Sequence, residues 1–429
     1  MKASIRAIRG MNDILPPESF GWAKVEQLAR SLFYAYSYAE IRLPIVEQEA
    51  LFIRSIGEVT DIVEKEMYTF VDHLSQDKLA LRPEGTAGCV RAVIEHHLTF
   101  SGAKRLFYIG PMFRHERPQK GRYRQFHHIG AESFLFAGPE IEVEQLLWLT
   151  RLWQSLEIEH DVKLEINSLG DKEARGIYRQ RLQDYFLRHE ALLDEDAKRR
   201  LDTNPLRLLD SKNPAMQDLI AQAPSILDFL SPESRQRFDQ LLAWLDALGI
   251  AFTVNPKIVR GLDYYNDTVF EWTTAKLGAQ ATVCAGGRYD TLVESLGGKP
   301  TPAFGFAIGM ERLMALLPEV SACRAPAPLH VYIIPFSSAE IPVALHFAED
   351  LRTQGLAGEV HLNGGSIKSA MRRADGSEAL FAALIGEEER ITHTVSLKPL
   401  RLGGEQRRLH FNDAIQWVRH QCSDLKTSP

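Results

Sequence analysis

A six-residue segment at 323–328, Cys-Arg-Ala-Pro-Ala-Pro, most limits how this chain can fold. Its two prolines fix the backbone dihedral φ and lack an N–H donor, so the segment favours a linker over a helix or a central strand. A chain of 429 residues is also too long for one ordinary core. We therefore predict two domains, residues 1–325 and residues 326–429.

The first domain mixes strand-like and helix-like patterns. Apolar residues recur at helical spacing from Trp22 to Tyr36, which predicts a helix, whereas Tyr38–Phe52 is expected to be extended and interrupted at Pro44. Gly305–Leu317 is expected to be a strand that turns into a helix at Gly309. Further strands are predicted at 106–109, 126–136, 251–254, 268–272 and 281–285.

Residues 171–248 differ from their surroundings because they are charged, rich in Leu, Arg and Asp, and almost free of β-branched runs. This composition predicts an inserted helical module with breaks near 204–205 and 211–214. Beyond the linker, strands are expected at 330–335, 359–362 and 380–385, helices at 341–351 and 367–374, and then a final strand and helix. Such alternation predicts a compact α/β domain.

Composition excludes several classes of protein. The apolar share of 45% and the charged share of 25% are ordinary for a globular protein, and no apolar run is long enough to cross a membrane. Residues 1–17 carry charges and prolines and lack the apolar stretch of a signal peptide. The four cysteines are scattered without a Cys-x-x-Cys pair, which argues against a zinc site and favours a reducing cytoplasm. With a net charge of −6, any nucleic-acid contacts must come from local basic patches.

The densest chemical signal lies in residues 113–126, where five cations fall within eleven residues between two strand-like runs. Arginine offers a planar fork of donors to phosphate oxygens, so this loop could hold phosphates. The alternative is a solvated charged hairpin, which is the commoner outcome for a loop of this composition.

Three further segments could carry chemistry. Arg260–Tyr265 and Gly286–Asp290 are individually compatible with simple turns, and the glycine pair lacks the spacing of a dinucleotide or phosphate loop. In Gly305–Leu313, Arg312 occupies the first turn of an apolar helix, where the helix dipole disfavours a cation, and such conflicts tend to mark function. The doublets at 96–97 and 127–128 predict no metal site, because adjacent histidines on a strand face opposite sides.

Taken together and in order, these motifs resemble the class II aminoacyl-tRNA synthetases, and within them the histidyl-tRNA synthetase family. The Pro44 segment, residues 108–136 and residues 305–313 are similar to the three class II motifs, and residues 260–265 and 286–290 to the two histidine-specific motifs. Residues 8–13 and 82–86 also resemble the family. The resemblance implies an α+β catalytic domain with a mixed, mainly antiparallel sheet, the helical insertion, and a C-terminal α/β anticodon-binding domain. It also implies a cytoplasmic homodimer, with the Pro44 segment at the interface.

The activity implied by this resemblance is histidine–tRNA ligation. L-histidine would be activated with ATP, accompanied by Mg²⁺, to histidyl-adenylate and pyrophosphate, and histidine would then pass to the 3′ end of its tRNA. No tightly bound cofactor, protein-held metal or membrane is implied.

Site residues follow from the same resemblance. Arg114 and Arg260 would be catalytic, with Arg260 in the place that a metal ion fills in related enzymes, and Gln119 would meet the tRNA acceptor end. ATP would be bound by Arg114, Arg122, Phe126 and Arg312. Histidine would be bound by Glu84, Gly85, Thr86, Arg114, His128, Glu132, Arg260, Tyr264, Tyr265 and Tyr289.

One residue departs from the family pattern: His128 stands where a glutamine is usual. A neutral imidazole can accept a hydrogen bond from the substrate ammonium, but a protonated one cannot. With an ordinary pKa of about 6.5, His128 would make KM for histidine rise as the pH falls from about 7.5 to about 6. The alternative is that its side chain points away from the pocket.

Two other functions compete with this one. A paralogous regulatory subunit of histidine biosynthesis shares the catalytic fold but lacks the anticodon-binding domain and loses active-site residues. A plain RNA-binding protein on the same scaffold would not need the arginines of an ATP site. The chain retains Arg114, Arg260 and Arg312 and continues well beyond Pro328, which favours the enzyme.

Overall fold

The computed structural model describes residues 4–57, 60, 62–119, 121–203, 205–211, 213–258, 262, 264–278, 282–318 and 329–426. The chain separates into two compact units, Met1–Cys323 and Arg324–Pro429, which are described in turn. None of the helices in these described ranges is long and apolar enough to cross a membrane.

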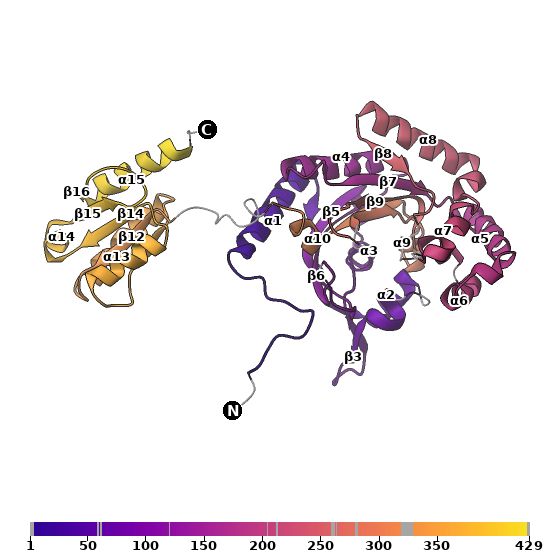
Figure 1. Cartoon of the computed structure of the whole chain (residues 1–429), viewed down its shortest axis with the longest axis horizontal. Coiled ribbons are helices and arrows are strands. Elements are labelled where there is room, and N and C mark those ends of the chain that lie inside the picture. Colours follow the sequence, from indigo (N-terminus) through magenta and orange to yellow (C-terminus); the bar gives the residue numbers. More distant parts are fainter. Residues whose placement is uncertain are drawn as a thin grey trace. The chain divides into compact units, whose positions relative to one another are not determined.

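An eight-stranded sheet forms the centre of the first unit (Figure 1). Its order is β1 (Ala39–Glu40), β5 (Lys104–Phe113), β6 (Gln125–Phe134), β11 (Ala303–Gly309), β10 (Thr282–Arg288), β9 (Asn266–Thr273), β7 (Lys163–Ser168) and β8 (Phe252–Val254). Only the β1–β5 and β7–β8 pairs are parallel. The mixed, mainly antiparallel sheet expected for this domain is therefore confirmed.

Helices cover both faces of this sheet. On one face, α1 (Glu18–Ala35), α4 (Glu140–Ser155) and α8 (Pro232–Ala247) share a core that includes Phe33, Phe107 and Trp148. On the other, α3 (Thr86–Glu95) and α9 (Leu292–Ser295) pack around Tyr108 and Tyr289. Phe107 and Tyr108 enter different cores because successive strand residues point to opposite faces.

A three-stranded sheet of β2 (Val46–Gln48), β4 (Lys78–Leu81) and β3 (Tyr68–Val71) adjoins α2 (Glu49–Ile56) and a π-helix at Ile62–Glu66. The prediction that Tyr38–Phe52 is extended is wrong from Glu49 onward. Leu51, Phe52 and Ile56 bury one face of α2 in a small core with Ala80 and Ala87, at spacings that only a helix provides.

The segment predicted to be a helical module contains helices and no strand among its described residues. It contains α5 (Lys172–Leu187), α6 (Glu195–Thr203), α7 (Gln217–Ala221) and α8, joined by short 3₁₀ turns. Tyr178, Leu182, Phe186 and Met216 belong to a core of its own. Figure 1 shows α5, α6 and α7 gathered at one end of the sheet.

The second unit has a five-stranded sheet in the order β13 (Gly358–Val360), β12 (Val331–Pro335), β14 (Phe381–Ile385), β15 (Thr394–Pro399) and β16 (Arg407–His410). Its helices are α12 (Ile341–Thr353), α13 (Ile367–Gly376), α14 (Glu387–Thr392) and α15 (Phe411–Lys426). The α/β class is confirmed, but a single final strand was expected. Two antiparallel strands follow α14, which ends at His393 in a left-handed conformation (φ 52°) that reverses the chain.

Candidate active site

A cavity of about 300 Å³ lies on the α3 side of the eight-stranded sheet. Alternate residues of β6 face it, and their partners on β11 are small: Ala307 and Gly309 line the cavity, and Gly305 lies beside Glu132. Small floor residues leave space above the sheet that larger side chains would fill. The cavity is therefore built into the sequence of β11 and β6.

A carboxylate surrounded by hydroxyl donors lies at one end of this region. Glu132 is fully buried, and its Oε1 accepts from the Thr86 hydroxyl at 2.7 Å and the Tyr108 hydroxyl at 3.1 Å. Its Oε2 accepts from the Tyr289 hydroxyl. Burial raises the pKa of Glu132 to about 8, although these three hydrogen bonds oppose the shift. With a pKa of about 8 this carboxyl carries a proton at neutral pH, whereas an exposed glutamate is ionised there.

Tyr108, which the sequence analysis did not single out, depends on two glycines. A Cβ at either Gly85 or Gly130 would lie 2.3 Å from atoms of the Tyr108 ring. One feature could have indicated Tyr108. It pairs with Gly130 on β6, and alternate residues of β6 on that side face the cavity. Gly305 plays the same part for Glu132, whose Oε2 lies 1.8 Å from where a Cβ would stand.

Glu84 and Thr86 lie at the amino end of α3. The Glu84 carboxylate accepts from the backbone N–H groups of Thr86 at 2.5 Å and Ala87 at 2.9 Å, so it caps the helix. Burial raises the pKa of Glu84, and the Arg114 charge partly offsets that shift. Glu84, Gly85 and Thr86 all line the cavity.

Three tyrosines form a cluster against this acidic end. The ring centroid of Tyr264 lies 4.6 Å from that of Tyr265 and 5.7 Å from that of Tyr289. Tyr264 and Tyr265 line the cavity, whereas Tyr289 and Glu132 lie one layer behind its wall and reach it through Thr86 and Tyr108. The structure thus brings these predicted residues together but does not place all of them at the cavity surface.

Three arginines converge at the other end. Arg114 donates from Nε to the Pro83 carbonyl at 2.9 Å, with its guanidinium 5.3 Å from the Phe126 ring centroid. Arg312 donates to the carbonyls of Gly121 and Thr282. Arg122 forms an ion pair with Glu116. Burial, followed by repulsion from Arg122, lowers the pKa of Arg312, and the Glu116 carboxylate opposes this shift.

Glu311 explains how the helix that carries Arg312 is fixed. Its two oxygens accept from the His127 backbone N–H, each at 3.0 Å, and its Oε1 lies 3.0 Å from His127 Nδ1. This contact ties α10 (Met310–Met314) to β6. Because α10 has only five residues, Arg312 lies in its last turn, so the conflict with the helix dipole expected from the sequence does not arise.

His128 lines the cavity, on a strand position flanked by Gly110 and Gly309. Its Nδ1 is buried and has no hydrogen-bond partner among the described residues. Burial, followed by the charges of Arg114 and Arg312, holds the pKa of His128 well below its ordinary value. The predicted titration between about pH 7.5 and about pH 6 is therefore wrong, because desolvation keeps the imidazole neutral in that range.

The remaining predicted residues lie at or beyond the edge of the described site. Arg260 falls outside the described residues. Gln119 is exposed at the tip of the β5–β6 loop, where its backbone pairs with that of Arg122. The Gly10 carbonyl accepts from Arg124 N at 2.7 Å, so the N-terminal motif packs against the same loop.

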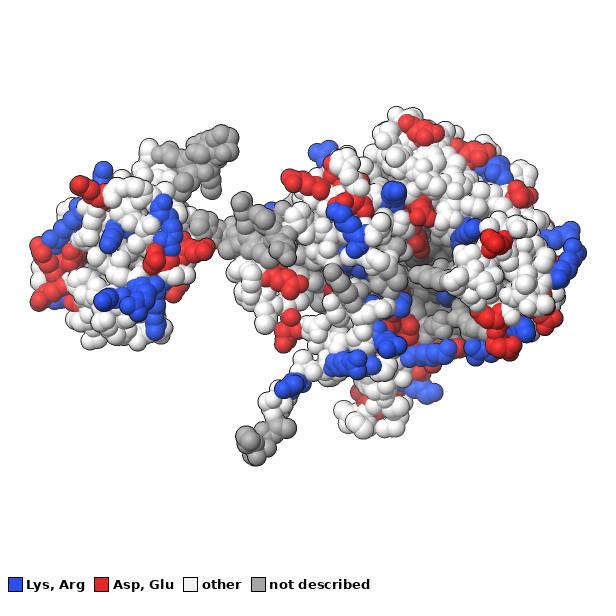
Figure 2. Space-filling view, in the orientation of Figure 1, with Lys and Arg blue, Asp and Glu red and all other residues white. Residues whose placement is uncertain are grey.

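Charge on the first unit is unevenly distributed. Figure 2 shows Lys and Arg side chains gathered in a band along the lower part of this unit, although the net charge of the chain is −6. Within the ranges that the structure describes, no group of three or more His, Cys, Asp and Glu residues could hold a metal ion.

Comparison with known families gives two matches. Residues 10–313 match the model described as histidyl-tRNA synthetase, and residues 330–421 match the model described as anticodon binding domain.

Individual relatives agree with these matches. The chain is 54% identical over 418 residues to a histidine–tRNA ligase of Methylobacillus flagellatus, covering 97% of this chain and 99% of that one. It is 56% identical over 414 residues to one from Nitrosomonas europaea, covering 96% and 98%.

Solved structures show the same fold. An apo histidyl-tRNA synthetase of S. aureus is similar with a TM-score of 0.79 and 33% identity, covering 97% of this chain and all of that one. A Bacillus halodurans chain titled as an ATP phosphoribosyltransferase regulatory subunit or histidyl-tRNA synthetase is similar with a TM-score of 0.64 and 21% identity, covering 90% and 99%. The latter likeness shows the fold alone.

Proposed function

The chain belongs to the histidyl-tRNA synthetase family and ligates histidine to tRNA, and from its cavity we propose how the described residues divide that work. One observation carries the proposal: a buried carboxylate with hydroxyl donors lies at one end of the cavity region and three arginines at the other. An amino acid and a nucleoside triphosphate need those two environments side by side.

We assign the acidic end to histidine. A neutral imidazole offers one N–H donor and one acceptor nitrogen. The N–H can donate to the Thr86 or Tyr108 hydroxyl, which Glu132 holds from one layer behind the wall, and a tyrosine hydroxyl can donate to the other nitrogen. The Glu84 carboxylate and the Thr86 hydroxyl lie where they can meet the substrate ammonium. The buried His128 Nδ1 is a further acceptor for that ammonium, since the imidazole is neutral. An isostere lacking one of these groups would leave a buried partner unpaired.

We assign the cationic end to ATP. Arg114 would hold the α-phosphate and the substrate carboxylate, and Arg122 and Arg312 the outer phosphates. Phe126 and Arg312 would enclose the adenine ring between them. Mg²⁺ enters with ATP and neutralises phosphate charge, and the Glu271 carboxylate in the cavity is an oxygen ligand of the kind Mg²⁺ accepts.

Adenylation then needs positioning more than proton transfer. The histidine carboxylate is already ionised and attacks the α-phosphorus in line as pyrophosphate leaves. Arg114 and, by family resemblance, Arg260 would stabilise the charge that develops on the phosphoryl oxygens. In the second step a terminal ribose hydroxyl of the tRNA attacks the mixed anhydride, with Gln119 near the acceptor end.

The second unit would bind the anticodon, consistent with the family that it matches. We also propose a homodimer formed through the Pro44 segment. Ile45 and Val46 are about two-fifths exposed there, beside a cavity of about 580 Å³ that Pro44, Leu51 and Ile94 help to line. A cytoplasmic location accords with four scattered cysteines that include no Cys-x-x-Cys pair.

Histidine-dependent ATP–pyrophosphate exchange tests the division of the cavity. Glu132→Gln should raise KM for histidine about 5- to 150-fold, because the amide NH2 cannot accept and leaves a buried hydroxyl unpaired, with little change in KM for ATP. Arg312→Gln should raise KM for ATP instead. Glu294→Gln, on the exposed surface of α9, is the matched control and should change neither. If Glu132→Gln leaves KM for histidine at the wild-type value, the assigned pocket is wrong.

A further inference from the structure

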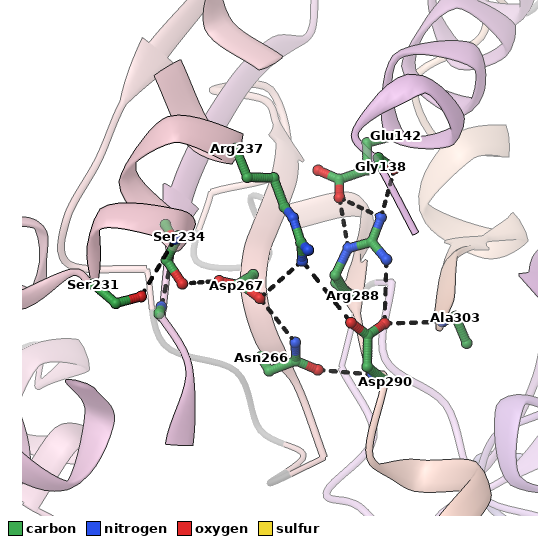
Figure 3. Close-up of polar contacts among 12 residues, drawn as sticks. Gly138, Glu142, Ser231, Ser234, Arg237, Asn266, Asp267, Arg288, Asp290 and Ala303 are labelled. Carbon is green, nitrogen blue, oxygen red and sulfur yellow. Dashed lines mark hydrogen bonds and ion pairs between the residues drawn. The ribbon is translucent and has the colours of Figure 1, made fainter. Parts of the chain in front are cut away.

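Helix α8 of the inserted module is bonded to the strands that carry the pocket tyrosines (Figure 3). The Ser234 hydroxyl donates to Asp267 Oδ1 at 2.6 Å, and Arg237 donates to Asp267 Oδ2 at 3.1 Å. Arg237 also lies 3.9 Å from Asp290 Oδ2. A single helix turn of the module therefore contacts Asp267, two residues after the first histidine-specific segment, and Asp290, the last residue of the second.

The contact continues between those two segments. The Asn266 side chain donates to Asp267 Oδ2 at 3.1 Å, and its carbonyl accepts from the Asp290 N–H at 2.8 Å. Asp290 Oδ1 accepts from the Ala303 N–H at 2.9 Å and from Arg288 at 3.2 Å. Figure 3 shows these side chains converging between α8 and the strand ends.

Arg288 fixes the end of this network in the protein interior. It is fully buried, and its five N–H groups meet the Glu142 carboxylate twice, the Asp290 carboxylate, and the carbonyls of Phe136 and Gly138. Burial alone would lower the pKa of Arg288, but Glu142 and Asp290 raise it, so the guanidinium stays charged. Breaking such a pair is costly, and the backbone at this point is therefore rigid.

Tyr265 and Tyr289 each stand next to a network residue in the chain. Tyr289 lies between Arg288 and Asp290, and its hydroxyl donates to Glu132. Tyr265 directly precedes Asn266, and its carbonyl accepts from Arg175 of α5 at 2.5 Å. The module thus holds the backbone on each side of the tyrosine cluster, through α5 at one point and α8 at another.

The geometry at Asp267 points to placement of the backbone as its main role. Its φ is 47°, in the left-handed region that Asp and Asn tolerate better than most residues, and its N–H donates to the Gly170 carbonyl at 2.9 Å. Arg237 is 30% exposed, so its pairing with Asp267 adds little to overall stability. The pair instead links α8 to the start of β9.

We propose that Arg237 and Asp267 are positioning residues for histidine recognition. Through them the inserted helical module sets the position of Tyr265 and Tyr289, and the module is thereby a structural part of the amino-acid pocket. This proposal rests on the assignment of the acidic end of the cavity to histidine. Neither residue lines the cavity, so each acts only through the backbone beside the tyrosines. Their loss should therefore raise KM for histidine and leave KM for ATP and kcat near wild type.

The test compares Asp267→Asn, Arg237→Gln and the double variant in full-length protein by histidine-dependent ATP–pyrophosphate exchange. Each single change should raise KM for histidine by roughly 2- to 30-fold, the range seen when a residue acts through bonded neighbours. The double variant should raise KM for histidine by less than the two single effects combined, because the Arg237–Asp267 contact is shared by both changes. Arg237→Lys, which keeps the cation, should restore most of the wild-type KM.

Two comparisons make the test decisive. Arg235→Gln removes another arginine of α8, whose bond to the Leu227 carbonyl lies within the module, and should leave KM for histidine unchanged even if the melting temperature falls. An equal rise in KM for this control would overturn the proposal in favour of general destabilisation. Unchanged KM in Asp267→Asn and Arg237→Gln would also overturn it. A normal KM in Glu132→Gln would instead show that the pocket assignment has failed.

Discussion

Replacing Glu132 by glutamine should stabilise the catalytic unit at alkaline pH. Glu132 is fully buried, and burial raises its pKa from the ordinary 4.5 to about 8. In the unfolded chain the same carboxyl titrates near its ordinary value. Between those two pKa values the folded state holds a proton that the unfolded state has released, so the stability contributed by this group falls as the pH rises.

The magnitude follows from the two pKa values. Each unit of difference corresponds to about 1.4 kcal/mol, and the contribution is fully present below pH 4.5 and lost as the pH passes about 8. Between about pH 5.5 and about pH 8.5 the wild type should lose on the order of 3 kcal/mol from this group. Glutamine cannot ionise, so the variant should lose none of it.

Urea unfolding at those two pH values measures the effect. Five of the six tryptophans lie in residues 1–323, so tryptophan fluorescence mainly follows the catalytic unit. The free energy of unfolding of Glu132→Gln, minus that of wild type, should therefore increase by on the order of 3 kcal/mol between the two pH values. Taking the difference cancels other titrating groups, and Glu294→Gln should show no such trend. A difference that does not change with pH would refute the assignment of a raised pKa to Glu132.

Three further outcomes are expected. Arg260→His should lower the adenylation rate by about 10²- to 10³-fold while the fold survives; an unchanged rate in pyrophosphate exchange would remove Arg260 from catalysis. Cleavage within residues 325–328 should leave a soluble fragment that forms histidyl-adenylate but charges tRNA poorly; full charging activity would show that the second unit is dispensable. His128→Gln should leave the pH profile of KM for histidine unchanged between about pH 6 and about pH 7.5, because the buried imidazole is already neutral there; a flatter profile in the variant would restore the titration that burial argues against.

Much of the site could be found from the sequence because its residues stand in short motifs. Arg114, Arg122 and Phe126 lie within one hairpin, and Glu84 and Thr86 within one helix start, so local order along the chain already brings them together. Tyr108 and Glu311 were missed because tertiary structure alone joins them to Glu132 and His127. Tyr108 meets Glu132 through the pairing of β5 with β6, and Glu311 meets His127 where α10 packs on β6. The network from Arg237 to Asp290 was not predicted either, because its members are separated by dozens of residues in the chain.

The amino-acid sequence by itself determined many strands and helices, the helical module, the α/β second domain and the residue types gathered in the cavity, but not α2 or β16. Periodicity and turn residues encode which face of an element is buried, and that is local information. Tertiary structure alone decided the electrostatic state of those residues. The pKa of Glu132 is raised to about 8 and that of His128 is lowered because surrounding elements remove water from both and place charges beside them. Desolvation depends on everything that packs around a group, and no stretch of sequence contains that information.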